Sequence, residues 1–294
     1  MMSAIFAACS RELQAMLLSP LAYVMGAIFA LGSGILTWNV SRFFDTARAE
    51  LDPLFFWQPW LLALIVPALA MRSWSEDIRS HVIDLYLTSP SSIWQVTFGK
   101  FLALCVIVLG FVALLLPYWW AVSYLGDPDH GQILSGFWSV FSLGLVFAAI
   151  TLAVSATTSQ QVVVFVISSA ICIFLLVSGL PSVTGVLSTS VPAPVVWAMQ
   201  NLSLLDMVSR GASGLMLLSD GVFAALLIAL ALTMATSRIH ARRSIGSDSG
   251  QNWIAIGFVA MLIALPSTKF VLDKAMPVKA DLTEYQVHSL SEPA

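Results

Sequence analysis

The fold is decided by the stretch LFFWQPWLLALIVPALAM (residues 54–71), which contains no charged residue. A second charge-free stretch, FLALCVIVLGFVALLLPYWW (residues 101–120), follows after a short polar segment. A helix needs about 20 apolar residues to cross the hydrocarbon layer of a bilayer. We therefore expect each stretch to belong to a membrane-spanning helix, and the segment between them to lie at the membrane surface.

The chain as a whole has the composition of an integral membrane protein. Of its 294 residues, 59% are hydrophobic and 10% are charged, and the mean hydropathy is +0.89. Soluble domains hold far more charged residues than this. The net charge of −3 gives no basis for nucleic-acid binding, so none is expected. The three cysteines lie far apart, which argues against a disulfide framework or a metal site.

The apolar runs predict six crossings and a seventh near the C-terminus. Residues 1–20 alternate apolar and polar positions at helical spacing, which predicts an amphipathic helix in the membrane interface. From Gly131 to Leu205 there is no charged residue, and the polar cluster TTSQQ (residues 157–161) divides this region into two crossings. The expected spans are residues 21–40, 54–71, 96–120, 134–156, 162–180, 217–238 and 252–272.

The positions of the basic residues predict that the N-terminus is inside. Up to the sixth span, seven Lys and Arg residues then lie on the inner side and three on the outer side. This orientation makes three connections cytoplasmic: residues 72–95, TTSQQ, and the polar linker 244–251. The seventh span then places the tail, residues 273–294, outside. Lys100, near the start of the third span, is expected to reach toward the lipid headgroups.

The polar segment SEDIRSHVIDLYLTSP (residues 75–90) holds three acidic residues, an arginine and a histidine. As a helix over residues 75–87 it is amphipathic. Its apolar stripe consists of Trp74, Ile78, Val82 and Leu85. Ser73 and Glu76 fit a capping box, and Pro90 would end the helix. We expect a helix lying across the cytoplasmic face, with its apolar stripe against the membrane bundle and its polar face toward a soluble partner.

Residues 76–103, EDIRSHVIDLYLTSPSSIWQVTFGKFLA, resemble the first cytoplasmic loop of ABC type-2 permeases. That loop usually carries an acidic–Arg pair, Gly-Thr, an acidic residue, leucines, a proline, and Gly-Lys at the start of the next span. Here His81 and Val82 replace Gly-Thr, and Asp84 replaces the usual Glu. The matching residues are Glu76, Asp77, Arg79, Asp84, Leu85, Leu87, Thr88, Pro90, Gly99 and Lys100.

The resemblance extends over roughly residues 10–243 and is strongest to the permease associated with gliding motility. The further blocks are LLSPLAYVMGAIFALGSG (17–34), YLGDPDHGQILSGFW (124–138), SATTSQQVV (155–163) and NLSLLDMVSRG (201–211). It implies an all-α, six-helix exporter-type permease bundle over residues 21–243, in the cytoplasmic (inner) membrane of a bacterium.

The resemblance also implies partners. In this family, the segment corresponding to residues 75–87 is a coupling helix that docks on an ATP-binding subunit and passes its movement to the membrane helices. Two copies of that subunit, and a second copy of the permease or a homologous permease, are expected. The docking residues implied are Glu76, Asp77, Arg79, His81, Asp84, Leu85, Thr88 and Pro90.

The C-terminal segment DLTEYQVHSLSEP (residues 281–293) resembles the opening of the extracytoplasmic accessory subunit that accompanies gliding-motility permeases. The seventh span and this segment then look fused to a six-span permease, which implies an extracytoplasmic accessory subunit as a further partner. A docking tail and a frayed tail both remain open.

The chain lacks a Gly-rich phosphate loop, so ATP and Mg are expected on the partner ATPase and not here. We expect no catalytic, cofactor-binding or metal-binding residues and no enzyme activity of the chain itself. Asp127, Asp129 and His130 fit a solvated turn better than a metal site. His81 and Asp84 fit a surface polar pair. The alternatives are an ion-coupled secondary transporter, which the scarcity of ionisable groups in the spans argues against, and a non-transporting membrane scaffold for an extracytoplasmic partner.

Overall fold

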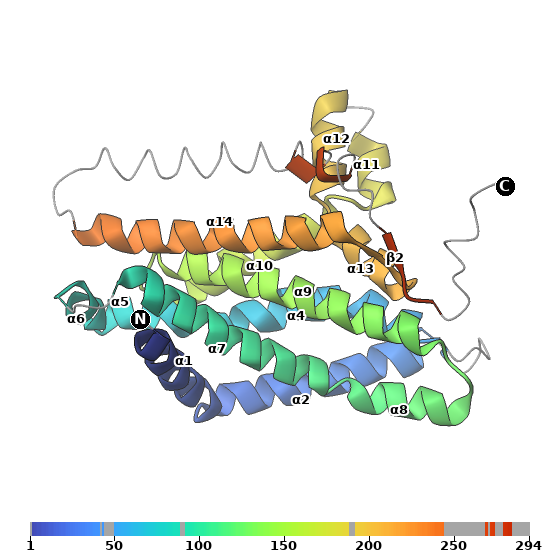
Figure 1. The fold of residues 1–294 in the computed structure, drawn as a ribbon, viewed down its shortest axis with the longest axis horizontal. Coiled ribbons are helices and arrows are strands. Elements are labelled where there is room, and N and C mark those ends of the chain that lie inside the picture. The colour runs from blue at the N-terminus through green and yellow to red at the C-terminus, as the bar shows by residue number, and fades with distance from the viewer. Residues whose placement is uncertain are drawn as a thin grey trace.

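The computed structural model describes residues 2–41, 43, 50–88, 92–187, 192–243, 268–269, 271–273 and 279–283. Within these ranges the chain is all-α apart from two three-residue strands (Figure 1). Five helical segments of this part are long and apolar enough to cross a membrane, which indicates a multi-pass membrane protein. These segments are Pro20–Val40, Asp52–Arg79, Ile93–Leu125, His130–Ser155 and Leu218–Arg242.

The five segments correspond to five of the seven predicted spans. The predicted span 162–180 corresponds to α10 (Gln161–Val177), an apolar helix of 17 residues that is shorter than the five. Of the predicted span 252–272, only residues 268, 269, 271 and 272 belong to the described part, and the linker 244–251 lies outside it. The finer division into six or seven crossings therefore stays a prediction.

The first crossing follows directly on an N-terminal helix. α1 (Met2–Leu17) ends two residues before Ser19, whose side chain accepts a hydrogen bond from the Leu21 amide at the start of α2 (Pro20–Gly34). Pro20 suits the first helical position because its missing N–H would have no partner there. α2 continues as a π-helical turn, η1 (Ile35–Val40).

The second crossing runs without a break into the charged segment. α4 (Asp52–Ala70) contains Pro59 and Pro67 in its interior and still continues as a helix. Past Met71 the helix continues as α5 (Arg72–Arg79), and a short helix α6 (Val82–Thr88) follows. The segment predicted to lie across the membrane surface is therefore in part an extension of the second span.

The remaining helices complete a bundle around α9 (His130–Ser155), the central helix. Its neighbours are α4, α7 (Ile93–Ala113), α10, α13 (Leu205–Ala212) and α14 (Leu218–Arg243). α9 has fully buried leucines and phenylalanines along its length, such as Leu143 and Phe147. α8 (Leu116–Leu125), α11 (Pro181–Leu187) and α12 (Ala193–Leu202) lie outside this core (Figure 1).

The two ends of the bundle hold different segments. One end, which we call the α5–α6 end, holds the start of α1, the α9–α10 connection and the end of α14 (Figure 1). Gln161 donates a hydrogen bond to Glu76 there, and Arg242 donates to the Thr157 carbonyl at 2.9 Å. The segments predicted to be cytoplasmic that the structure describes thus lie at one end. α8 lies at the opposite end, which we call the α8 end.

The described part of the C-terminal tail lies against the α8 end. β2 (Lys279–Asp281) pairs antiparallel with β1 (Leu215–Leu217), with Ala280 opposite Met216. The Leu282 amide extends the contact by donating to the Gly214 carbonyl at 3.1 Å. Residues 279–283 therefore contact residues 214–217 of their own chain.

Candidate functional site

A buried lysine joins three parts of the chain that are distant in sequence. Lys100 lies near the start of α7, and its side chain is 1% exposed. Its Nζ donates to Glu12 Oε2 of α1 at 2.7 Å and forms an ion pair with Asp77 Oδ2 of α5 at 2.9 Å. It also donates to the backbone carbonyl of Ser73 at 2.6 Å. We call Glu12, Asp77 and Lys100 the ion cluster.

Neighbouring side chains complete the environment of the ion cluster. Trp74 is fully buried, and its ring centre lies 5.0 Å from the Lys100 ammonium, within the range of a cation–π contact. The Arg11 guanidinium lies 3.8 Å from the Asp77 carboxylate, so Asp77 has a cation nearby in addition to Lys100. Buried charges persist only when they are paired, and here each carboxylate meets the ammonium directly.

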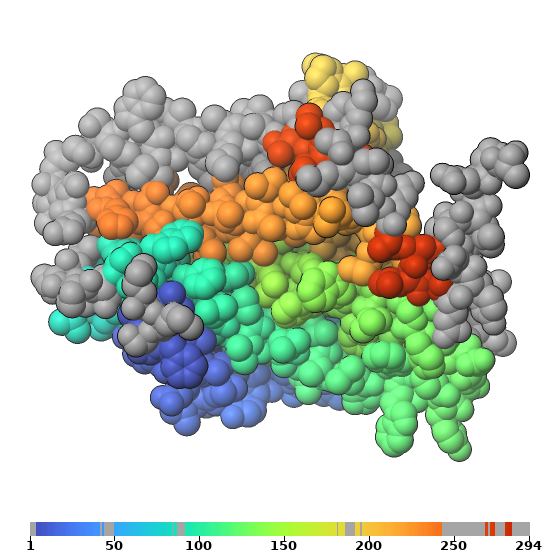
Figure 2. All heavy atoms as spheres, viewed as in Figure 1, coloured from blue at the N-terminus to red at the C-terminus, as the bar shows by residue number. Residues whose placement is uncertain are grey.

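Gly99 allows α1 to approach α7 closely enough for the ion cluster to form. A Cβ at this position would lie 2.7 Å from both the Ala8 Cβ and the Ile5 carbonyl oxygen of α1. In Figure 2 the atoms of α1 lie directly beside those of α7. The Gly-Lys pair thus serves two purposes, since glycine makes room for α1 and lysine binds it.

This arrangement corrects the expectation for Lys100 and adds a contact to the expectation for α1. Lys100 does not reach toward headgroups, because its ammonium is held inside by two carboxylates. α1 is also more than an amphipathic helix resting on the membrane. Its Glu12 is turned inward to Lys100, whereas Phe6 is 74% exposed.

The predicted single helix over residues 75–87 is wrong, because the chain breaks between α5 and α6. His81 has a φ of +58°, in the left-handed region, where a helix of L-residues does not continue. The break changes which residues face inward. Leu85 is 69% exposed instead of seated on the bundle, and Ile83 is buried in its place.

The predicted capping box is also absent. Ser73 lies inside a helix that continues from α4, so there is no free helix start for its hydroxyl to cap. Glu76 instead forms an ion pair with Arg79 at 2.8 Å and accepts a hydrogen bond from Gln161. These contacts tie α5 to the α9–α10 connection.

The structure separates the predicted docking residues into two groups. Arg79, His81 and Leu85 are exposed, and the Glu76 side chain is about one-third exposed. The Asp77 side chain is 15% exposed and turned toward Lys100. Reversal of the Asp77 charge is therefore expected to harm folding. Periodicity alone placed Asp77 on the polar face of the helix, toward a soluble partner. The side chains of Asp84 and Thr88, and all of Pro90, lie outside the described part.

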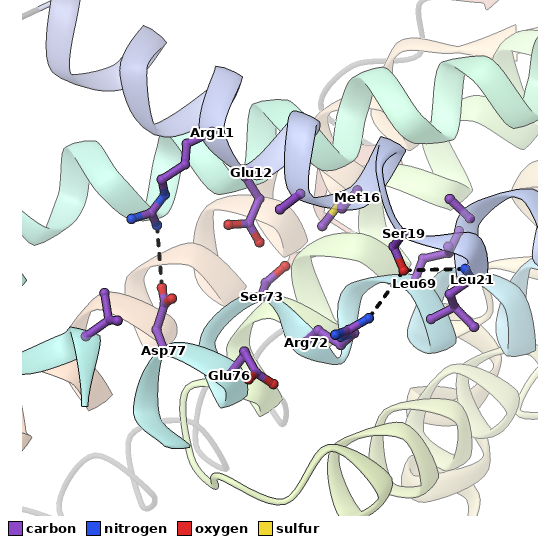
Figure 3. Close-up of a pocket in the computed structure, with 13 residues that line it drawn as sticks. Arg11, Glu12, Met16, Ser19, Leu21, Leu69, Arg72, Ser73, Glu76 and Asp77 are labelled. Carbon is purple, nitrogen blue, oxygen red and sulfur yellow. Dashed lines mark hydrogen bonds and ion pairs between the residues drawn. The ribbon is translucent and has the colours of Figure 1, made fainter. Parts of the chain in front are cut away.

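A pocket of about 280 Å³ opens beside the ion cluster, between α1, the start of α2 and the junction of α4 with α5 (Figure 3). Arg72 lies on its wall and donates a hydrogen bond to the Ser19 hydroxyl at 3.3 Å. The lining residues are Arg11, Glu12, Ala15, Met16, Ser19, Leu21, Ala22, Leu69, Arg72, Ser73, Glu76, Asp77 and Val82. The pocket thus combines charged groups with an apolar wall.

A second ion cluster, which sequence analysis missed, lies at the α8 end. The guanidinium of Arg210 on α13 donates hydrogen bonds to both carboxylate oxygens of Asp220 on α14, the shortest at 2.6 Å. Lys269 is buried nearby, 3.9 Å from Asp220 and 5.1 Å from the ring centre of Phe223. The signal available in the sequence was Arg210 in the predicted outer loop together with Asp220 near the start of the predicted sixth span.

The turn considered as a metal site has structural contacts instead. Asp129 caps α9 by accepting a hydrogen bond from the Gln132 amide at 3.0 Å. His130 Nδ1 accepts a hydrogen bond from the Trp119 indole at 3.1 Å. Within the part of the chain that the structure describes, no group of three or more His, Cys, Asp and Glu side chains is placed to hold a metal ion.

A scan against protein-family models and a search of curated proteins found no match to this chain.

Proposed function

We propose that this chain is the membrane-spanning permease subunit of an ATP-driven ABC transporter. It would couple ATP hydrolysis by a partner subunit to export, or to force transmission across the membrane. The observation that carries the proposal is the ion cluster, which ties the charged segment at the α5–α6 end to α1 and α7.

A subunit that receives movement at one end needs strong connections between the receiving segment and its membrane helices. Asp77 lies on α5, two residues before the end of that helix, and Lys100 lies inside the next crossing. Breaking a buried ion pair by removing one partner costs about 3–5 kcal/mol. A displacement of α5 would therefore move α7 and α1 with it, because separating them would leave buried charges unpaired.

The receiving surface would be the exposed side of α5 and α6. Arg79 and Leu85 are exposed there, and they offer a charge and an apolar anchor to a soluble protein. Interfaces of this kind commonly depend on a few such anchors. Because the chain has no phosphate loop, the proposal assigns ATP and Mg to the partner, and hydrolysis to two copies of that partner.

The proposal is tested by affinity purification of the tagged full chain from native membranes. We expect a soluble protein with a phosphate loop to copurify, together with ATP hydrolysis. Leu85→Asp should reduce its recovery. Tyr124→Asp is the matched control, since Tyr124 is 89% exposed at the α8 end. Recovery of the ATPase in equal amounts with Leu85→Asp, or absence of any ATPase with the unaltered chain, would contradict the proposal.

A further inference from the structure

Arg72 is a cation without a carboxylate partner inside the described part of the chain. Its guanidinium donates only to the Ser19 hydroxyl, whereas the other basic groups around the pocket have carboxylates close by. Lys100 and Arg11 together balance the charges of Glu12 and Asp77, and Arg79 pairs with Glu76. The pocket and its immediate surroundings thus carry four cations against three carboxylates. The excess positive charge is at Arg72, and it favours an anionic ligand.

The shape of the site favours a ligand that is apolar as well as anionic. Ala15 and Met16 of α1 and Leu21 and Ala22 of α2 form one wall of the pocket. Figure 3 shows Arg72 and Ser19 close together beside Leu21, so the anion-binding group and the apolar wall are adjacent. A free phosphate ion would leave that wall exposed to water, whereas a lipid would cover it.

The position of the pocket also matches a membrane lipid. It lies at the junction of the N-terminal helix with the first crossing, at one end of the bundle. The side chains around this junction are apolar and exposed, including Leu18 at 84%, Tyr23 at 66% and Val24 at 52%. In a membrane such side chains face acyl chains, and the level of Arg72 is then the level of the headgroups.

We propose that this pocket binds the phosphate of a membrane phospholipid. Arg72 would pair with the phosphate oxygens, and the Ser19 hydroxyl would donate to one of them. Arg11, whose side chain is 50% exposed, lies 3.8 Å from Asp77 and would remain the partner of that carboxylate. The pocket volume of about 280 Å³ would hold the headgroup, with the acyl chains continuing along the apolar surface of α2. The inference does not depend on the proposed function, because a scaffold or an ion-coupled transporter would present the same pocket.

The test is a titration of the purified full chain, in a mild detergent, with phosphatidylglycerol, with binding counted by native mass spectrometry. We expect Arg72→Gln to weaken binding about 10-fold or more, since a charge-assisted hydrogen bond to an ion contributes about 1.5–3 kcal/mol. Arg242→Gln is the control, because Arg242 lies at the same end but outside the pocket. Its affinity should equal that of the unaltered chain. The intrinsic tryptophan spectrum and the size-exclusion profile confirm that each variant is folded.

Two further arms separate the sources of the phosphate. Glycerophosphoglycerol and inorganic phosphate carry the anion without acyl chains, and we expect both to bind far more weakly than the lipid. Equal binding of these soluble anions would overturn the lipid assignment in favour of a soluble phosphate. Unchanged lipid affinity in Arg72→Gln, or an equal loss in Arg242→Gln, would overturn the site itself.

Discussion

Removal of the ammonium from the ion cluster is the perturbation whose effect can be calculated most directly. In Lys100→Met the side chain keeps most of its length and apolar stem but loses its charge. Glu12 and Asp77 would then remain near each other, 11% and 15% exposed, without the cation that separates them. The Ser73 carbonyl would also lose its donor.

The expected cost is about 3–5 kcal/mol, the usual penalty for leaving a buried charge without its partner. In proteins of a few hundred residues, 1 kcal/mol shifts the melting temperature by about 2 °C or more. The melting temperature of Lys100→Met should therefore fall by about 6 °C or more. Tryptophan fluorescence during heating in detergent measures this melting temperature, and Trp74 beside the ion cluster is one of the ten tryptophans that contribute to the signal.

A matched variant separates the lost charge pairing from lost packing. The triple variant Lys100→Met, Glu12→Leu, Asp77→Leu replaces all three charges by apolar groups of similar size. Such replacements are often neutral or stabilising, so the triple variant should recover most of the loss. A melting temperature of Lys100→Met equal to that of the unaltered chain would refute the reasoning. So would a triple variant that is less stable than the single one.

Three further predictions concern packing, topology and the second ion cluster. Gly99→Ala should destabilise the chain by about 1–3 kcal/mol through the clash with α1, whereas Gly110→Ala in the same helix meets open space and should be neutral or stabilising. In a chain without its three native cysteines, a membrane-impermeant maleimide should label Tyr124→Cys on intact cells but Leu85→Cys only after permeabilisation; the reverse pattern would invert the topology. Asp220→Asn should lower the melting temperature, because two cations lose their carboxylate, and an unchanged value would show that this cluster is not stabilising.

The positions of most crossings could be predicted because hydrophobic length is a local property of the sequence. The charge-free run 54–71 lies inside α4 or next to its end, and the run 101–120 lies within α7 and α8. The division of the long region after Gly131 at TTSQQ also agrees with the separation of α9 from α10. A polar cluster between two apolar runs can be recognised in the sequence without knowledge of any tertiary contact.

The details of the charged segment could not be predicted in the same way. A regular 3.6-residue period placed Leu85 against the bundle. The left-handed conformation of His81 breaks this period, and Leu85 on the following helix α6 is exposed. Histidine adopts the left-handed conformation more often than most residues, but it marks a break far less strongly than glycine does. The break arises in a tertiary setting where Trp74 and Ile83 are both buried, and the apolar pattern alone does not contain that setting.

The ion cluster was missed for a related reason. Glu12 and Lys100 are separated by 88 positions, and their contact depends on how closely α1 packs on α7. A partial signal was present, since Gly99 and Lys100 adjoin at the start of a span and Glu12 is the one acidic residue of the N-terminal helix. Only the packing of the two helices shows that these residues belong together.

Site-specific photo-crosslinking at Leu85 in native membranes tests the account most directly. A photoreactive amino acid at this exposed position of α6 should form a cross-link to a soluble protein that carries a phosphate loop. The same amino acid at Tyr124, exposed at the α8 end, should not cross-link to that protein. An ATP-binding partner captured only from Leu85 is the result that the account predicts. Cross-links from Leu85 to lipid alone, or to the same proteins as from Tyr124, would contradict it.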